Sequence, residues 1–226
     1  MSGILYIVAT PIGNLEDITL RALKVLKEAD AIITEDTRHS RGLLAHFGVQ
    51  KKLVSYFEYS KQQKAEAIIS HLEAGENLAL ITDAGTPAVS DPGARLVALA
   101  RSRGIDVVPI PGPSAATAAL SVCGFPTDPF HFWGFLPPSN NKRRKIYEAI
   151  ALLPGTHCFY ESPHKILKRV DEWGNYFSEF YLMIGRELTK KFETILWGKF
   201  PEVAERLKQS EARGEYTIVL SREKLV

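Results

Sequence analysis

One loop concentrates backbone-bending and acidic residues that could do chemistry. The segment ITDAGTPAVSDPG runs from Ile81 to Gly93 and follows the apolar residues Leu78, Ala79 and Leu80, so it reads as a buried strand that enters a loop. Such loops commonly bind a ligand. A phosphate site uses backbone N–H groups together with Lys or Arg. This loop instead supplies two carboxylates and no cation, so a phosphate there would meet like charge.

A metal also fits this loop poorly. Asp83 and Asp91 lie eight positions apart with no histidine nearby, and the six histidines form no HxxxH or HExxH pair. The nucleotide motifs GxGxxG and GxxxxGK[ST] do not occur either. We therefore expect no metal and a ligand of neutral or positive character. S-adenosylmethionine, which carries a sulfonium and an amino group, fits that description.

The elements around this loop predict how it is positioned. Strands and helices alternate through the first half of the chain, which predicts an open parallel sheet with helices on both faces. The loops TPIGNLED, EDTRHSR and PGPSA follow other predicted strands. We expect them to gather with the acidic loop at the carboxyl edge of the sheet, where α/β folds bind ligands. Asp91 and Pro92 are predicted to begin the next helix as N-cap and first residue.

The pattern changes near residues 111–115. The second half reads as another α/β unit with more strand pairs and a mixed sheet, so we predict two domains, 1–112 and 113–226. The segment 130–138, FHFWGFLPP, reads as packed aromatic positions ahead of a polar turn. Cys123 and Cys158 lie far from any CxxC motif and suit free thiols in a reducing cytoplasm. No apolar window of about 20 residues predicts a membrane span, and no signal peptide is evident, so we expect a cytoplasmic protein.

A basic run offers the best candidate contact with an anionic partner, since the net charge is only +2. NNKRRK, residues 140–145, falls in the first turn of a predicted helix, where the macrodipole disfavours cations. Phosphate contact explains that placement, although a solvated helix face is the alternative. Trp133 and Phe135 either stack bases or pack in the core. The residues predicted to bind RNA are Arg41, Lys142, Arg143, Arg144, Lys145, Lys190 and Lys191.

Several segments together resemble a known family. YIVATPIGNLEDIT, ITEDTRHSRGLLAHFG, ITDAGTPAVSDPG, PIPGPSAA, GFLP, FYESPHKI and RELTKKFET are similar, in the same order, to segments of the ribosomal RNA small subunit methyltransferase I family of the tetrapyrrole methylase superfamily. The resemblance implies 2′-O-ribose methylation of a cytidine in small-subunit rRNA. It also implies a homodimer that acts on this rRNA or the 30S subunit, with S-adenosylmethionine in a cleft between the two domains. The family's helical C-terminal extension is expected to be absent, because the sequence stops at Val226.

The resemblance also suggests roles for individual residues. Gly85-Thr86-Pro87 stands where the superfamily has a Gly-Asp-Pro turn at the donor. The implied cofactor-binding residues are Pro11, Gly13, Asp83, Gly85, Thr86, Pro87, Val89, Pro111, Gly112, Ser114, Ala115 and Tyr160. The catalytic candidates are Glu35, Asp36, Arg38, Glu161 and Glu187. The alternative for these residues is a structural role in turns, helix caps and ion pairs.

Two other functions remain open from the sequence. One is a methylase of a tetrapyrrole precursor on the same fold, which would be expected to keep the Gly-Asp-Pro turn. The other is a non-catalytic RNA-binding or ribosome-binding module, which would leave the acidic glycine loop without a role.

Overall fold

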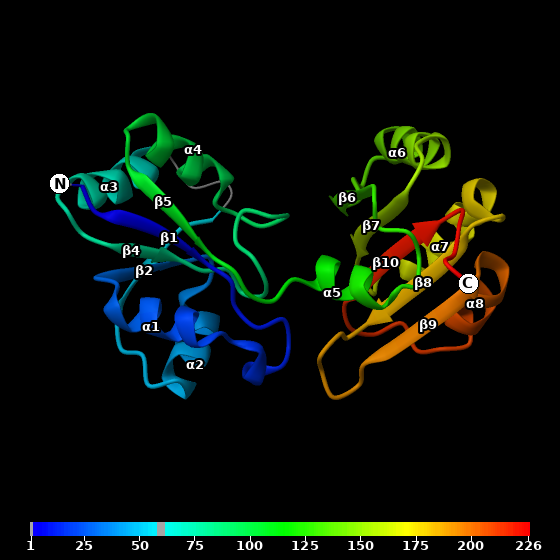
Figure 1. Ribbon diagram of the computed structural model, residues 1–226, viewed down its shortest axis with the longest axis horizontal. Coiled ribbons are helices and arrows are strands. Elements are labelled where there is room, and N and C mark those ends of the chain that lie inside the picture. The colour runs from blue at the N-terminus through cyan, green and yellow to red at the C-terminus, as the bar shows by residue number, and fades with distance from the viewer. Residues whose placement is uncertain (1, 58–61) are drawn as a thin grey trace. The chain divides into compact units, whose positions relative to one another are not determined.

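The chain divides into two compact units in the computed structural model, which describes residues 2–57 and 62–226. The first unit is Met1–Ser114 and the second is Ala115–Val226. Figure 1 colours the first from blue to green and the second from green to red. Each unit contains its own sheet and its own helices.

The first unit is built on a parallel sheet. In the described residues its strand order is β3-β2-β4-β1-β5, and every paired strand is parallel. The strands are β1 (Ile4–Val8), β2 (Ala31–Thr34), β3 (Lys52–Ser55), β4 (Leu78–Leu80) and β5 (Asp106–Ile110). The helices are the 3₁₀ turn η1 (Leu15–Asp17), α1 (Leu20–Glu28), α2 (Thr37–His46), α3 (Gln62–Glu73) and α4 (Ala94–Ser102). The predicted open parallel sheet is confirmed.

Helices cover both faces of this sheet because side chains alternate along each buried strand. Ile33 of β2 belongs to a cluster with residues of α3 and α4, whereas its neighbour Ile32 belongs to a cluster with residues of α1 and α2. The sheet is therefore the middle layer of three, and the loops after its strands remain available at its carboxyl edge.

The second unit is built on a mixed sheet, as predicted. The order is β6-β7-β10-β8-β9, and in the described residues β6 and β7 are parallel while the other pairs are antiparallel. Its strands are β6 (Phe130–Phe135), β7 (Thr156–Glu161), β8 (Tyr181–Arg186), β9 (Thr194–Lys199) and β10 (Tyr216–Ser221). Its helices are α5 (Ala115–Val122), α6 (Asn140–Leu152), α7 (Ile166–Phe177) and α8 (Phe200–Lys208). Strand β6 was not predicted from the sequence.

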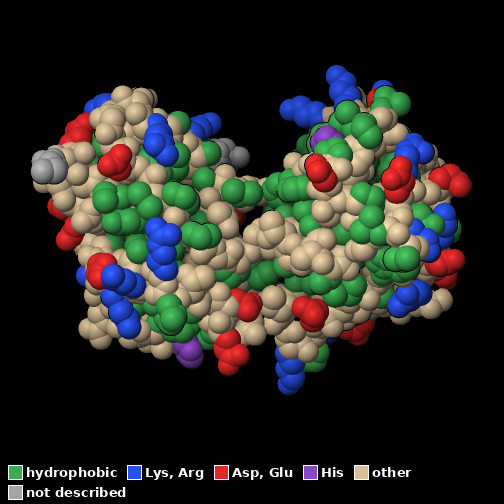
Figure 2. Space-filling view, in the orientation of Figure 1, with side chains coloured by type: hydrophobic (Ala, Val, Ile, Leu, Met, Phe, Trp, Pro, Cys, Tyr) green, Lys and Arg blue, Asp and Glu red, His purple; other side chains and the backbone are tan. Residues whose placement is uncertain are grey.

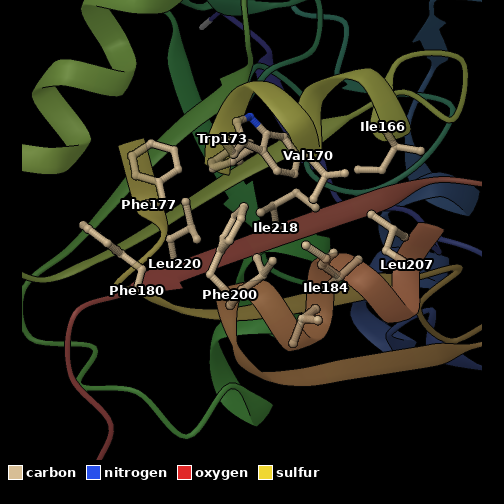
Figure 3. Packing of buried hydrophobic residues seen from close by; sticks show 14 of the residues in the cluster. Ile166, Val170, Trp173, Phe177, Phe180, Ile184, Phe200, Leu207, Ile218 and Leu220 are labelled. Carbon is tan, nitrogen blue, oxygen red and sulfur yellow. The ribbon is translucent and has the colours of Figure 1, made fainter. Parts of the chain in front are cut away.

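One apolar cluster holds this sheet against α7 and α8 (Figure 3). Trp173 and Phe177 of α7 and Phe200 of α8 are almost completely buried against Ile184 of β8 and Ile218 of β10. A fully buried side chain of this size contributes about 1.5–3 kcal/mol, so this face of the sheet is a stable support for the loops at its edge.

The start of α4 differs from the prediction. The helix begins at Ala94 with Gly93 as its N-cap, so Asp91 does not cap it. Gly93 has φ 132°, and a Cβ at this position would lie 2.7 Å from Cδ2 of Leu80. The loop therefore packs so tightly against β4 that only glycine fits here, and the helix begins after it. None of the helices in the described residues is both long and apolar enough to cross a bilayer.

Candidate functional site

The loops after β1 and β4 are joined by a short bridge at the carboxyl edge of the first sheet. The N–H of Thr10 donates to the carbonyl of Gly85 at 2.9 Å, and the N–H of Gly85 donates back at 3.1 Å. This antiparallel bridge stands outside the parallel ladders. The Thr10 hydroxyl also donates to the carbonyl of Thr82 at 3.0 Å. These hydrogen bonds hold the two loops at one fixed spacing.

The loop after β5 is attached to the same assembly through Thr86. Its hydroxyl donates to the carbonyl of Pro113 at 3.2 Å. Gly85 has φ 86°, which an L side chain rarely adopts. A Cβ on Gly112 would lie 3.0 Å from Cβ of Ala9, so this loop approaches β1 closely. Thr86 thus joins the loops after β4 and β5.

The loop after β4 contains two residues with strained backbone. Ala88 and Ser90 have φ values of 68° and 62°, each costing about 1 kcal/mol or more for a residue with a Cβ. Val89 between them remains 46% exposed. No sequence pattern predicts this strain, because neither alanine nor serine is typical of left-handed backbone. Strained segments of this kind gather at ligand sites and switches.

Three carboxylates at this edge affect one another. The pKa of Asp91 is raised to about 6, mainly by burial and further by repulsion from Glu35 and Asp83. A hydrogen bond from Thr82 acts in the opposite direction but is outweighed. One oxygen of Asp83, Oδ1, is buried without a hydrogen-bond partner among the described residues. In those residues no group of three His, Cys, Asp or Glu is arranged to hold a metal ion. The edge is therefore electrostatically suited to a cationic ligand and hostile to a phosphate.

Most of the predicted cofactor residues lie in these three loops. Pro11 and Gly13 follow β1, and the group after β5 is Pro111, Gly112 and Ser114. The loop after β4 contains Asp83, Gly85, Thr86, Pro87 and Val89. Two predicted residues belong to the second unit instead: Ala115 begins α5 and Tyr160 lies in β7.

Asp36 and Arg38 have a local structural role. Asp36 is the N-cap of α2 and accepts from the N–H of Arg38 at 2.8 Å, and the Arg38 guanidinium lies 3.2 Å from the same carboxylate. These hydrogen bonds hold the pKa of Asp36 below its usual value. Both side chains are solvent-exposed. A carboxylate stabilised in its ionised form is a weak proton acceptor, so Asp36 fits the structural alternative.

A second set of predicted residues gathers in the second unit. Strands β6, β7 and β8 run in the same direction, so the loops that follow them share one edge. Tyr216 of β10 is the register partner of both Glu161 and Arg186. Glu161 is 5% exposed, lies 3.4 Å from Nε of Arg169 and accepts from the N–H of Ser162 at 2.8 Å. Its carboxylate orders the start of the ESPH loop.

Glu187 orders the loop after β8. Its carboxylate accepts from the N–H of Glu215 and from Nζ of Lys190, each at 2.9 Å. Burial opposes ionisation of Glu187, but these two contacts outweigh it and keep its pKa below the usual value. Lys190 also pairs with the Glu215 carboxylate at 2.9 Å. Two carboxylates therefore hold the ammonium group of Lys190, and its contact with RNA stays a prediction.

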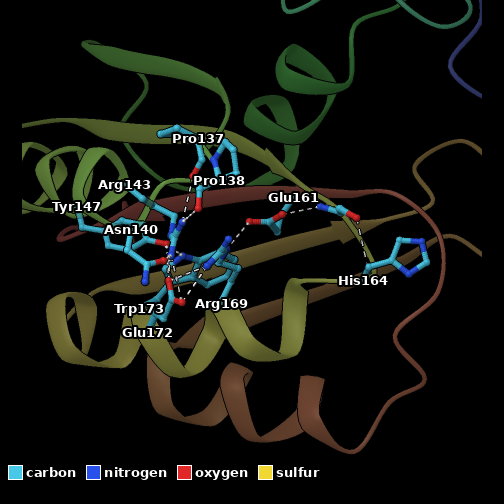
Figure 4. A network of polar contacts seen from close by, with 11 residues as sticks. Pro137, Pro138, Asn140, Arg143, Tyr147, Glu161, His164, Arg169, Glu172 and Trp173 are labelled. Atoms are coloured by element: carbon cyan, nitrogen blue, oxygen red, sulfur yellow. Dashed lines mark hydrogen bonds and ion pairs between the residues drawn. The ribbon is translucent and has the colours of Figure 1, made fainter.

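The prediction that Arg143 contacts a phosphate requires a correction. Arg143 lies in the first turn of α6, as the basic run predicted, but its side chain is only 2% exposed. The guanidinium donates to the carbonyls of Pro137 and Pro138 and to the carboxylate of Glu172, which also pairs with Arg169 (Figure 4). Arg143 is thus a buried connector between the end of β6 and α7, and not a phosphate ligand.

The neighbouring cations of α6 remain at the surface. Lys142 and Lys145 are exposed and form no ion pair with another described residue, and Arg144 makes an exposed contact with Glu148 at 3.4 Å. Lys and Arg side chains project from the second unit beside α6 (Figure 2). Lys191 and Arg41 are exposed as well, in the loop after β8 and in α2. The predicted RNA-binding residues therefore divide into exposed cations and the two occupied ones, Arg143 and Lys190.

The structure distinguishes the two upstream aromatic residues. Trp133 is partly buried and donates its indole N–H to Nδ1 of His157 at 3.2 Å, so it packs in the fold. Phe135 is 62% exposed, and its ring lies 5.3 Å from that of Tyr160. Phe135, at the end of β6 that leads to the basic run 140–145, therefore exposes far more of its ring to solvent than a core residue would.

Comparison with known proteins places these features in a family. The family model described as Tetrapyrrole (Corrin/Porphyrin) Methylases matches residues 4–217. The chain is 47% identical over 219 residues to the ribosomal RNA small subunit methyltransferase I of Escherichia coli O157:H7, covering 96% of this chain and 77% of that protein. It is 44% identical over 218 residues to the protein of the same name from Halalkalibacterium halodurans, covering 96% and 75%.

Solved structures share the fold at low sequence identity. A diphthine synthase superimposes with a TM-score of 0.76 at 15% identity, covering 98% of this chain and 91% of its own. The uroporphyrin-III C-methyltransferase of Thermus thermophilus, complexed with S-adenyl homocysteine, superimposes with a TM-score of 0.66 at 19% identity, covering 97% of each chain. At these identities the likeness concerns the fold alone.

Proposed function

Because the chain belongs to the ribosomal RNA small subunit methyltransferase I family, within the tetrapyrrole methylases, we propose that it methylates small-subunit rRNA with S-adenosylmethionine as donor. The finer proposal is that the acceptor is the 2′-hydroxyl of a cytidine. We also propose that it works in the cytoplasm as a homodimer.

The observation that carries the proposal is the group of carboxylates at the carboxyl edge of the first sheet. Asp83 has a buried oxygen without a hydrogen-bond partner among the described residues, and burial together with repulsion from Glu35 and Asp83 raises the pKa of Asp91 to about 6. A ligand with positive charge relieves this repulsion and satisfies the orphaned oxygen. The ammonium and sulfonium of S-adenosylmethionine provide such charge, so the residues present fit this cofactor.

The residues proposed to hold the cofactor are those of the three connected loops. When bound, S-adenosylmethionine supplies an electrophilic methyl group on its sulfonium. Gly85, held by its bridge to Thr10, offers backbone without a side chain in the way. Asp83 would accept a hydrogen bond from a donor on the ligand. The fixed loop spacing limits the reorganisation needed on binding, which favours affinity.

We propose Glu35 as the group that accepts the proton from the ribose hydroxyl. It is exposed directly after β2 and influences Asp91 electrostatically. Hydrogen bonds hold the pKa values of Asp36 and Glu187 below their usual range, and the Glu161 carboxylate pairs with Arg169. A positioned carboxylate contributes about 10²- to 10⁴-fold to a rate, whereas orientation of the reacting groups supplies much of the remainder.

The proposal is tested by methyl transfer from labelled S-adenosylmethionine to three acceptors: 30S subunits, free small-subunit rRNA and a tetrapyrrole precursor. We expect label in RNA and none in the tetrapyrrole. Label in the tetrapyrrole alone would identify the protein as a precursor methylase. Intact cofactor binding without transfer to any RNA would contradict the proposed activity and favour a binding module.

A further inference from the structure

We propose that Phe135, Lys142 and Lys145 form a contact surface for an unpaired nucleotide of the RNA, with the base stacked on the Phe135 ring and the flanking phosphates on the two lysines. This proposal rests on the proposed function, because it assigns the RNA substrate to a particular surface. None of these three residues takes part in the donor edge of the first unit.

Strand β6 is shaped to present the Phe135 ring. In a regular strand Phe132 and Phe135, three positions apart, would point to opposite faces. The register between β6 and β7 shifts between these two residues, and Gly134 at this irregularity has φ 61°. Both rings consequently lie against Tyr160, at 5.1 and 5.3 Å between centroids. Bulges of this kind redirect side chains next to functional sites.

The Phe135 side chain is largely exposed to solvent although one side of its ring packs against Tyr160. Tyr160 is partly buried and backs the Phe135 ring, yet 62% of Phe135 remains accessible. A supported ring loses little conformational entropy when a base stacks on it. Base–aromatic stacking contributes about 1–3 kcal/mol per base and tolerates any sequence, since every base has a π face.

The buried Arg143 links this ring to the two lysines. Its guanidinium holds the carbonyls of Pro137 and Pro138, at 3.0 and 2.9 Å, two and three residues after Phe135. The same side chain hydrogen-bonds Asn140 in the first turn of α6. Lys142 in this turn and Lys145 at the start of the next are exposed. Arg143 therefore connects the segment after β6 to the first turn of α6 (Figure 4).

The charge of this turn indicates an anionic partner. The first turn of α6 contains no acidic residue, and its N-cap Ser139 makes no side-chain cap hydrogen bond. Cations at a helix N-terminus work against the macrodipole. Neither Lys142 nor Lys145 has an acidic partner in the described part of the chain. An RNA phosphate near the lysines offsets both unfavourable features, while the Phe135 ring receives the base.

The test uses Phe135→Leu, which keeps an apolar side chain but removes the stacking face, and Phe135→Trp, which keeps it. Phe130→Leu is the matched control, because Phe130 lies at the opposite end of the same strand and is 47% exposed. The affinity for a short single-stranded fragment of small-subunit rRNA is measured by fluorescence anisotropy. Cofactor affinity is measured by calorimetry, and thermal melts check folding.

We expect Phe135→Leu to weaken RNA binding about tenfold, while Phe135→Trp and Phe130→Leu remain within about twofold of wild type. Cofactor affinity should not change in any variant. Lys142→Ala with Lys145→Ala should lower the slope of log affinity against log salt by about 0.7 for each phosphate that the lysines neutralise. Equal RNA affinity for Phe135→Leu and Phe130→Leu would overturn the inference. Because binding is measured without turnover, this outcome is distinct from a failure of methyl transfer.

Discussion

Thr10 and Gly85 exchange two backbone hydrogen bonds, at 2.9 and 3.1 Å, although they come from loops that follow two parallel strands. The pair joins the loop after β1 to the loop after β4, and Thr86 next to Gly85 attaches the loop after β5. The proposed donor site depends on this connection, because each loop alone lacks the support to hold its backbone groups in place.

Replacing Gly85 with alanine should weaken cofactor binding more than it weakens the fold. A Cβ there would lie 3.5 Å from Cγ2 of Ile12, an ordinary contact, so the cost is mainly that of φ 86°. For an L residue that cost is about 1–2 kcal/mol. We expect cofactor affinity to fall at least tenfold by calorimetry, because relief of this strain shifts the loop.

Gly48→Ala is the control for this change. Gly48 follows α2 with φ 64°, and a Cβ added to it would meet no atom within 4 Å, so the conformational cost is comparable. Its thermal melting temperature should fall by a similar amount while cofactor affinity stays at the wild-type value. If the two variants lose affinity equally, Gly85 has no specific role in the donor site.

The carboxyl of Asp91 should make stability depend on pH. Burial and the repulsion from Glu35 and Asp83 raise its pKa from 3.8 to about 6. The folded state therefore binds this proton more tightly than the unfolded chain does. The resulting contribution of Asp91 to the free energy of unfolding is fully present below about pH 4 and is lost as pH rises through about 6. Asp91→Asn should become more stable than wild type over this range, by about 1–2 kcal/mol at pH 7 after allowance for solvent screening.

Urea unfolding of both proteins at a series of pH values from about 4 to about 7.5 measures this difference. Burial lowers the pKa of His157 to about 4, which changes stability in the opposite direction but equally in both proteins, so it cancels. A constant difference between the two stability curves would show that Asp91 does not titrate in this range.

Glu35→Gln should reduce kcat about 10²- to 10⁴-fold with little change in KM if Glu35 accepts the ribose proton. The neighbouring Asp36→Asn is the control, because asparagine also caps helices well and keeps the start of α2. Single-turnover methyl transfer at saturating RNA separates the chemical step from binding. A large loss in Asp36→Asn with normal rates in Glu35→Gln would reverse the two assignments.

Arg143 and Lys142 should respond oppositely to mutation despite being adjacent. Arg143→Ala removes a buried partner of Glu172 and two carbonyls, so the free energy of unfolding should fall by about 3–5 kcal/mol. Lys142→Ala, at an exposed position, should change it by about 0.5 kcal/mol at most and weaken RNA binding instead. Denaturant unfolding and anisotropy measure both effects. A stable Arg143→Ala variant would contradict the structural role given to this residue.

Much of the fold followed from patterns in the sequence. Buried apolar runs with helical crossovers indicated the parallel sheet of the first unit. Strand β6 was missed because Gly134, in a left-handed conformation, interrupts its run of aromatic residues, and because two prolines follow soon after the strand. The period of two that identifies a strand is interrupted at that irregularity.

The candidate sites were less predictable because side-chain partners decide roles. The loops at the carboxyl edge could be chosen from their composition, but nothing in the run NNKRRK indicates that Arg143 alone turns inward to Glu172. Lys190 likewise meets Glu215, 25 positions away in sequence. The bridge from Thr10 to Gly85 spans 75 positions, and no local pattern indicates a contact of that separation.

The chemical identity of the methylated product decides whether this protein is a ribose methylase of small-subunit rRNA. The rRNA is incubated with the protein and methyl-labelled S-adenosylmethionine, then digested to nucleosides and analysed by mass spectrometry, with a parallel alkaline digest. We expect label in 2′-O-methylcytidine within an alkali-resistant dinucleotide, and none with Glu35→Gln on the same time scale. Label on a base, or no label in rRNA from protein that binds the cofactor, would show that the proposed reaction is wrong.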